Sequence, residues 1–310
     1  MPRVGNGLAT ANEVHLNFSP AQPSIPVMKR LFFVSLALAT LLAGCATLDE
    51  RQRSWIFQPS DRSWWRGEEA AAGMSDVWID FNAPSTGQPV KLHGLWLAHE
   101  SLEKDARAPV MLYLHGARFN VTGSAFRARR MQELGFSVLS VDYRGFGKSS
   151  RELPSEAMAA EDARAAWEWL GREYPGRPRY IFGHSLGGAI AIELAAQVGD
   201  EAGTLVEGSF TSIPDVVSTY KWGWLPLGPL ITQRFEAVNR VAEVGSPLLV
   251  VHGSEDRTIA PELGRKLFEA ARGKKRFELV EGGSHHNTNA VGQPQYRAAL
   301  ADLFGLPLAP

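Results

Sequence analysis

From Asp76 to the end of the chain, short apolar segments alternate with longer segments that have helical spacing. The apolar segments predict strands at Val77–Phe81, Val90–Leu97, Val110–Leu114, Ser137–Val141, Tyr180–Phe182, Thr204–Glu207, Leu248–Val251 and Arg276–Val280. The segments between them predict helices at Ala125–Leu134, Glu156–Tyr174, Gly187–Val198, Glu262–Ala271 and Gln295–Phe304. Strands that alternate with helices indicate parallel β-α-β units, with helices on both faces of a sheet. We therefore predict an α/β fold around a mostly parallel sheet of about eight strands.

The composition agrees with a single large core. The chain has 310 residues, of which 45% are hydrophobic, and this excludes collagen, coiled coil and extended disorder. Its formal net charge is −1, so electrostatics gives no reason to expect a nucleic acid as partner. A single cysteine, Cys45, excludes a disulfide within the chain.

The N-terminal end has the three parts of a secretory signal. Two basic residues, Lys29 and Arg30, follow Met28, and an apolar run then extends from residue 31 to residue 43. The sequence Leu-Ala-Gly-Cys at 42–45 resembles the lipobox of bacterial lipoproteins. The resemblance implies that residues 28–44 are a cleaved signal peptide, and that Cys45 carries lipid. Residues 1–27 are then an upstream extension that does not belong to the protein.

Two other interpretations of the apolar run stay open. As a membrane-spanning helix it rises only about 20 Å, less than the ~30 Å bilayer core. As an ordinary cleaved signal it leaves Cys45 incidental. The lipoprotein interpretation predicts an exported protein, anchored by lipid in a bacterial membrane. Ala46 after the cysteine favours the outer membrane.

The domain organisation follows from this interpretation. We expect residues 45–75 to be a tether and residues 76–310 to be the folded domain. Three tryptophans in the tether are expected to pack on the domain or to touch the bilayer interface: Trp55, Trp64 and Trp65.

Between an apolar strand and an alanine-rich helix lies the sequence Gly-His-Ser-Leu-Gly-Gly at 183–188. This is the G-x-S-x-G pattern in the strand-turn-helix context that a nucleophile elbow requires. Glycines at 183 and 187 leave room for a sharp turn that lifts Ser185 above the edge of the sheet. Without catalysis, the same residues would form a plain turn with a capping serine.

A serine nucleophile needs a base, and the base needs a carboxylate to orient it. Asp256 follows one predicted strand, and the pair His285-His286 follows the next. The order Ser, Asp, His along the chain is that of the α/β-hydrolases. The chain resembles this superfamily from Val77 to Phe304, and most closely its membrane-associated depalmitoylases and monoacyl-ester hydrolases. The motifs that carry the resemblance are YLHG (113–116), VDYRGFGKS (141–149), GHSLGG (183–188), HGSEDRTIAP (252–261) and GGSHHNT (282–288).

The resemblance assigns roles to individual residues. It implies Asp256 as the acid, and it favours His286 over His285 as the base, because the family usually has Asn directly after the histidine. It implies the backbone N–H of Ala117 as an oxyanion donor, together with the N–H of Leu186 after the nucleophile. The Asp142–Arg144 pair is interpreted as structural, an ion pair within a glycine turn.

The substrate-binding residues are less constrained. An insertion of about 40 residues, at about 209–246, separates two predicted strands and has the composition of a small lid over an acyl groove. Ordinary packing over the sheet edge explains it equally well. The candidate substrate-binding residues are Arg118, His184, Trp222 and Trp224.

We therefore predict a serine hydrolase that cleaves carboxylic ester or thioester bonds through an acyl-enzyme. Its rate is expected to fall as the pH drops through a histidine pKa of about 6–7. The alternatives are an amidase or aminopeptidase, and a lipid-anchored binding protein without turnover. No metal-binding spacing and no dinucleotide fingerprint is present, so we expect neither a metal nor a cofactor. We expect a monomer whose partners are the membrane and a small-molecule acyl ester or thioester.

Overall fold

The computed structural model describes residues 25–60, 66–221 and 223–306, although the side chains at 25–28, 37–43 and 45 are not described. The chain divides into two compact units, Met1–Thr47 and Leu48–Pro310. The predicted extension 1–27 lies almost wholly outside the described residues, as do Trp64, Trp65 and Trp222. In the described part of the chain, no helix combines the length and the apolar character that crossing a membrane requires.

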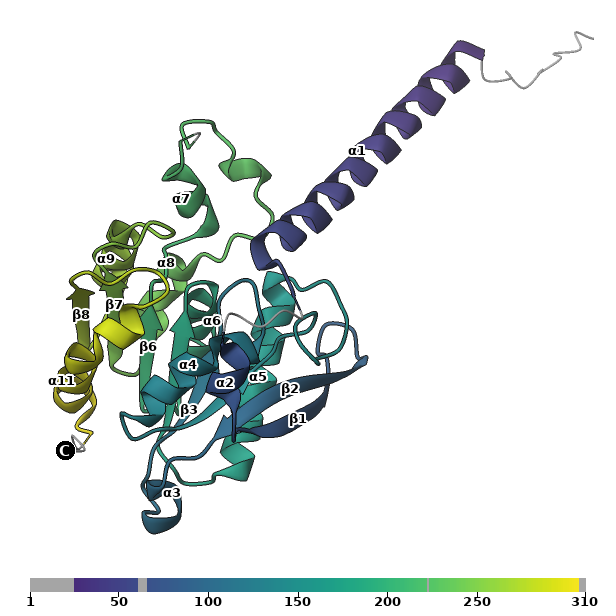
Figure 1. Ribbon diagram of the computed structural model, residues 1–310. Coiled ribbons are helices and arrows are strands. Elements are labelled where there is room, and N and C mark those ends of the chain that lie inside the picture. The colour runs from purple at the N-terminus through teal and green to yellow at the C-terminus, as the bar shows by residue number, and fades with distance from the viewer. Residues whose placement is uncertain (1–24, 61–65, 222, 307–310) are drawn as a thin grey trace, which may run out of the picture. The chain divides into compact units, whose positions relative to one another are not determined.

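The larger unit is built on one sheet of eight strands (Figure 1). The strands are β1 (Ser75–Asn82), β2 (Pro89–Leu97), β3 (Val110–Leu114), β4 (Ser137–Val141), β5 (Arg179–His184), β6 (Gly203–Glu207), β7 (Leu248–Gly253) and β8 (Lys275–Val280). Their order in the sheet is β1-β2-β4-β3-β5-β6-β7-β8. Strand β2 pairs antiparallel with both β1 and β4, and all the other neighbouring strands in this order pair parallel. The predicted fold class is confirmed.

Helices precede, connect and follow the strands along the chain. They are α1 (Ile25–Phe57), α2 (Gly67–Ala71), α3 (Ser101–Lys104), α4 (Val121–Gln132), α5 (Glu156–Glu173), α6 (Leu186–Ala195), α7 (Ile213–Ser218), α8 (Ala237–Arg240), α9 (Pro261–Ala270), α10 (Thr288–Val291) and α11 (Gln293–Phe304), with short 3₁₀ turns at Gly228–Leu230 and Val241–Glu243. The predicted helices all form, with ends shifted by up to a few residues.

Alternate residues of the central strands enter two separate cores. In β3, Leu112 and Leu114 pack with residues of α5, α6 and α9, whereas Met111 and Tyr113 pack with residues of α4 and α11. All five residues of β3 are buried. Because successive side chains point to opposite faces, a strand with helices on both sides must be apolar throughout. This explains why β3 has the unbroken apolar sequence VMLYL.

The end of α1 belongs to the folded domain. The larger unit begins at Leu48, well before the boundary at residue 76 that the sequence predicted. Phe57 is fully buried, with its ring centroid 5.7 Å from that of Phe235 and 6.4 Å from that of Phe146. The expected tether is therefore partly wrong: its first turns are helical and join the core, because apolar side chains there find a binding site on the domain. Trp55, by contrast, is 60% exposed.

The structure also corrects the expected Asp142–Arg144 pair. Arg144 Nε is instead 2.8 Å from Asp162 Oδ1, and its Nη2 is 2.6 Å from Glu161 Oε2. Asp142 accepts a hydrogen bond from the Val121 N–H and lies near two histidine rings. Since α5 supplies the partners of Arg144 from a distant part of the chain, local sequence did not reveal them.

Candidate active site

Ser185 lies at the turn between β5 and α6, in a backbone conformation that residues other than glycine rarely adopt. Its φ is 56° and its ψ is −120°. A Cβ atom at Gly183 would lie 2.2 Å from the Gly187 oxygen, and one at Gly187 would lie 2.1 Å from the Leu114 oxygen. Both positions therefore require glycine. The strain at Ser185 is sustained by this close packing, and it presents the hydroxyl at the carboxyl edge of the sheet.

A chain of two hydrogen bonds leads away from the hydroxyl. Ser185 Oγ is 3.0 Å from His285 Nε2, and His285 Nδ1 is 2.7 Å from Asp256 Oδ2. The other carboxylate oxygen of Asp256 accepts from the N–H groups of Thr258 and Ile259, at 2.9 and 2.8 Å. These are the distances that proton transfer from a serine to an oriented imidazole requires.

The charge of Asp256 is held by its neighbours. Burial opposes ionisation, but hydrogen bonds from His252 and His285 outweigh it and hold the pKa of Asp256 well below its ordinary value. The carboxylate therefore stays ionised throughout the neutral range. An ionised partner at Nδ1 fixes the imidazole so that Nε2 faces the serine.

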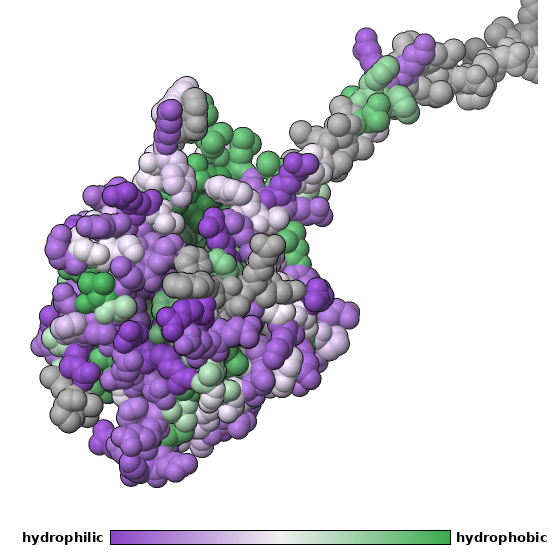
Figure 2. Space-filling view, viewed as in Figure 1, coloured by the Kyte–Doolittle hydropathy of each residue, from purple (hydrophilic) through white to green (hydrophobic). Residues whose placement is uncertain are grey.

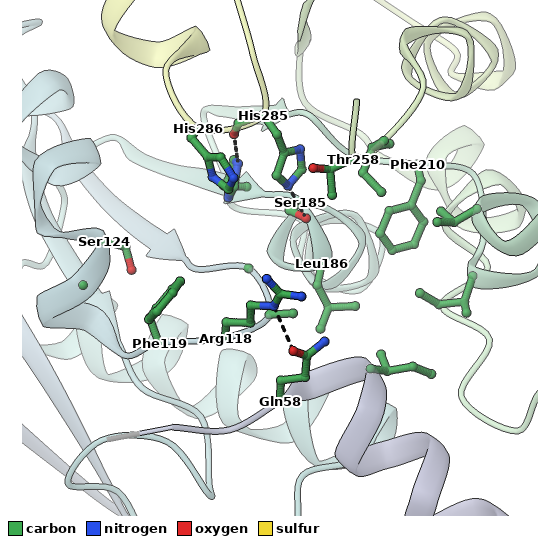
Figure 3. Close-up of a pocket in the computed structure, with 18 of the residues that line it drawn as sticks. Gln58, Arg118, Phe119, Ser124, Ser185, Leu186, Phe210, Thr258, His285 and His286 are labelled. Atoms are coloured by element: carbon green, nitrogen blue, oxygen red, sulfur yellow. Dashed lines mark hydrogen bonds between the residues drawn. The ribbon is translucent and has the colours of Figure 1, made fainter. Parts of the chain in front are cut away.

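The preference for His286 over His285 as the base is wrong. His285 makes both hydrogen bonds, whereas the His286 ring lies 5.4 Å away from it, turned by 82° (Figure 3). Asn287 Oδ1 accepts from the N–H of Ser284 at 2.7 Å and closes a turn around the two histidines. Within that turn, consecutive side chains point in different directions. The position of Asp256 therefore decides which of the two imidazoles is held toward the serine.

A buried ion pair between Arg127 and Glu207 lies behind His285, and it was not predicted from the sequence. Arg127 on α4 donates from Nη2 to the carbonyl oxygen of His285 at 3.0 Å, and its Nε is 3.0 Å from Glu207 Oε1 at the end of β6. Tyr296 on α11 donates to the other oxygen of Glu207. The signal was present in the sequence, because Glu207 ends an otherwise apolar strand. A carboxylate in that position needs a buried cation.

The candidate His184 is part of the same network. Its Nε2 lies 2.9 Å from Arg127 Nη2 and 3.0 Å from the carbonyl oxygen of His285. Burial, and then the positive charge of Arg127, lower the pKa of His184 well below its ordinary value. His184 borders the cavity, but its ring is engaged with protein atoms and supports the histidine loop.

Two backbone N–H groups near the serine are candidates for binding a developing oxyanion. Leu186 is the first residue of α6, so its N–H has no acceptor within the helix. Ala117 lies in the loop after β3, and among the described residues no acceptor is found for its N–H. In that loop Arg118 and Phe119 both have positive φ, 66° and 55°. This loop geometry brings the backbone after β3 to the serine.

A cavity of about 430 Å³ opens over Ser185. The residues of α7 and of the end of α1 give it an apolar lining, together with Leu186 and Phe210: Trp55, Ile56, Ile213, Val216 and Val217. The lining from α4 and the loop after β3 is mixed, with the polar side chains of Ser124 and Arg127 beside the rings of Phe119 and Phe126. In Figure 3, Phe210 and Ser124 lie on opposite sides of Ser185.

The remaining candidates have separate outcomes. Arg118 borders the cavity, with its Nε donating to Gln58 Oε1 at 2.8 Å (Figure 3). Trp224 does not line the cavity and is 74% exposed. Trp222 lies outside the described residues. In the described part of the chain, no cluster of three or more His, Cys, Asp or Glu residues is arranged to hold a metal.

Comparison with known proteins agrees with this geometry. Residues 105–226 match the family model described as "Serine aminopeptidase, S33". An uncharacterised protein of Mycobacterium tuberculosis is 35% identical over 266 residues, covering 85% of this chain and 89% of the relative. The lysophosphatidylserine lipase ABHD12 of Danio rerio is 29% identical over 210 residues, which cover 59% of this chain and 54% of the lipase.

Solved structures share the fold. The esterase Pf2001 of Pyrococcus furiosus superposes with a TM-score of 0.60 at 19% identity, covering 80% of this chain and 98% of the esterase. Est1E of Butyrivibrio proteoclasticus, solved with ferulic acid, superposes with a TM-score of 0.61 at 15% identity, covering 74% of this chain and all of that one. Fold and site thus define a hydrolase built on a wound α/β sheet. The chain belongs to the α/β-hydrolase superfamily, in one family with the mycobacterial protein.

Proposed function

We propose that the protein is a serine hydrolase that cleaves carboxylic ester or thioester bonds. The observation that carries this proposal is the hydrogen-bonded chain from Ser185 through His285 to Asp256. Ser185 attacks the carbonyl carbon as His285 Nε2 takes its proton. The N–H groups of Leu186 and Ala117 bind the oxyanion of the tetrahedral intermediate.

The two halves of the reaction use the same groups. The protonated His285 returns its proton to the departing alcohol or thiol, and the acyl group stays on Ser185 as an ester. Water then attacks that ester, with His285 again taking the proton, and the acid leaves. Asp256 stays ionised throughout and stabilises the imidazolium. The rate therefore falls at low pH, because a protonated imidazole cannot accept the serine proton.

The cavity favours a substrate with one acyl chain. The apolar lining beside α7 takes the chain, and the side with Ser124 and Arg127 takes the alcohol or thiol part. None of the described lining residues is Asp or Glu, whereas Arg118 and Arg127 both border the cavity. An aminopeptidase substrate carries an ammonium group that needs a carboxylate partner. This lining therefore favours neutral or anionic esters over peptides, and the lipase and esterase activities named for the relatives are in line with it.

The cellular location is part of the proposal. A lipid on Cys45, at the end of the Leu-Ala-Gly-Cys sequence, would hold a monomeric enzyme at the outer membrane of a bacterium. Intact-mass measurement of the mature protein tests this. It should begin at a diacylated Cys45, and an unmodified cysteine would contradict the anchor.

Labelling of the full chain with a fluorophosphonate probe tests the chemistry. The wild type should be labelled, and Ser185→Ala should lose labelling and lose ester hydrolysis by on the order of 10⁴-fold or more. His285→Ala should lower turnover by about 10² to 10⁴-fold, with a much smaller loss in His286→Ala as the matched control. A folded wild type without labelling, or a larger loss at His286, would overturn the mechanism. Turnover of matched ester, thioester and amide substrates then shows which bond the enzyme cleaves fastest.

A further inference from the structure

Large apolar side chains are exposed around one side of the cavity mouth. They come from the segment after α7 and from the end of α1: Trp55, Tyr220, Trp224, Leu225, Leu227 and Leu230. We call these six residues the lid face. Their exposed fractions run from 36% at Leu225 to 74% at Trp224. Figure 2 shows apolar side chains gathered in this region of the domain surface.

The lid face is one continuous part of the domain. Gln52 Nε2 donates to the Leu230 oxygen at 2.7 Å, and the Thr232 N–H donates to Gln52 Oε1 at 2.8 Å. Asp49 Oδ1 accepts from Gln233 Nε2 at 2.9 Å. These bonds join the end of α1 to the segment after α7. Trp55 and Tyr220 are both exposed and both line the cavity, so the face borders its opening.

The chain itself indicates what covers this face. The residues just before the domain include five large apolar side chains that are more than half exposed, and two basic residues precede them: Leu31, Phe32, Phe33, Val34 and Leu36 follow Lys29 and Arg30. Large apolar side chains partition into a bilayer, and basic residues beside them lie at the bilayer surface. Gln52 is seven positions after Cys45 along the chain, a reach of about 25 Å at most. In the uncleaved chain this segment meets the bilayer, and after cleavage the lipid proposed on Cys45 does, so in both forms the chain meets the bilayer a few residues before Gln52.

The composition of the lid face fits the same partner. Tryptophan and tyrosine are enriched where protein meets the headgroup region of a bilayer, and leucine is enriched just below it. The segment that supplies five of the six has no acidic residue between Asp215 and Glu236. A group of large apolar side chains that are exposed together marks an interaction site.

We propose that the lid face inserts into the lipid bilayer, so that the mouth of the cavity opens onto the membrane and acyl chains enter it directly from the lipid. Membrane insertion does not depend on ester hydrolysis. The entry of acyl chains rests on the proposed ester hydrolysis. The two parts therefore need separate measurements.

Tryptophan quenching tests the insertion. The full chain is reconstituted in vesicles of phosphatidylcholine with or without brominated acyl chains. Trp224→Phe should lower the fraction of emission that bromine quenches. Trp78→Phe is the matched control: that indole is 42% exposed on β1, at the opposite edge of the sheet, and its removal should not lower the quenched fraction. Equal quenched fractions in wild type and Trp224→Phe would overturn the insertion.

Turnover tests the route of the substrate. Leu230→Ser should slow hydrolysis of a long-chain monoacyl ester carried in vesicles by about tenfold, and leave a short water-soluble ester unaffected. Leu279→Ser, at a 42% exposed leucine on β8, is the matched control and should change neither. Equal losses on both esters, or a face that forms cross-linked dimers in vesicles, would overturn the route. Quenching without any ester hydrolysis would contradict the proposed function and leave the insertion standing.

Discussion

His184 has a side chain whose charge state matters to the whole active site. It lies directly before the nucleophile, is 6% exposed, and touches both Arg127 and the carbonyl oxygen of His285. A positive charge there would face the Arg127 guanidinium without solvent between them. Burial and Arg127 lower its pKa, so the folded protein keeps this ring neutral.

This gives a pH dependence of stability with a definite sign. The unfolded chain binds a proton at His184 below about pH 6.5, whereas the folded chain does not. The contribution of His184 is therefore present above that pH and is lost as the pH falls, by about 1 kcal/mol between pH 6.5 and 5.5. Urea unfolding of His184→Gln should show a correspondingly flatter dependence than the wild type. Parallel curves would show that His184 has the same pKa in the folded and the unfolded chain, and would contradict its neutral state in the fold.

At the scale of elements, one ion pair joins three parts of the fold. Arg127 brings α4 to the end of β6 through Glu207, and to the loop after β8 through the carbonyl oxygen of His285. Both charged side chains are almost fully buried, at 4% and 1% exposed. Removing one partner of such a buried pair lowers the stability of the protein strongly, because the other partner is left as an unpaired buried charge.

Arg127→Met should therefore lower the free energy of unfolding by about 3–5 kcal/mol, and it should reduce fluorophosphonate labelling because the His285 loop loses its donor. Adding Glu207→Gln removes the unpaired charge, so the double variant should recover part of the stability without recovering the labelling. Chemical denaturation and labelling of the same samples measure both. Additive losses of stability would show that the two charges do not interact.

At the scale of the molecule, the segment that leads into the domain, the end of α1, packs into the domain's core. The last turns of α1 contribute Ile56 and Phe57 to the larger core and Trp55 to the cavity. The active site therefore has one wall from the N-terminal segment and another from α7. Any displacement of that segment alters the cavity as well as the core.

Phe57→Ala should lower the free energy of unfolding by about 3–5 kcal/mol, since it empties a fully buried aromatic site between Phe146 and Phe235. Trp55→Ala removes a larger but exposed ring two residues earlier and should cost within about 0.5 kcal/mol. Guanidinium unfolding of the full chain compares the two. Equal effects would mean that the end of α1 does not pack on the domain.

The elements of the fold were predictable because their signals are local. The apolar sequence VMLYL and the Gly-His-Ser-Leu-Gly turn each carry their own geometry. The ends of the helices were less predictable, since a few residues of fraying cost little energy. The partner of Arg144 was missed because Asp162 lies on a different element. Local spacing can indicate that a buried charge needs a partner, but it does not show which element supplies that partner.

The sequence alone determined the order of the strands and helices along the chain and the turn that strains Ser185. It also determined that Asp256 and a histidine pair come at the ends of neighbouring strands. Hydrophobic period and glycine placement act over a few residues, so they can be read in one dimension. The tertiary structure decided that His285, and not His286, faces the serine, that Arg127 and Glu207 hold its loop, and that Phe57 enters the core. Each of these depends on side chains that meet across distant segments, where distance and burial select one partner among chemically equal candidates.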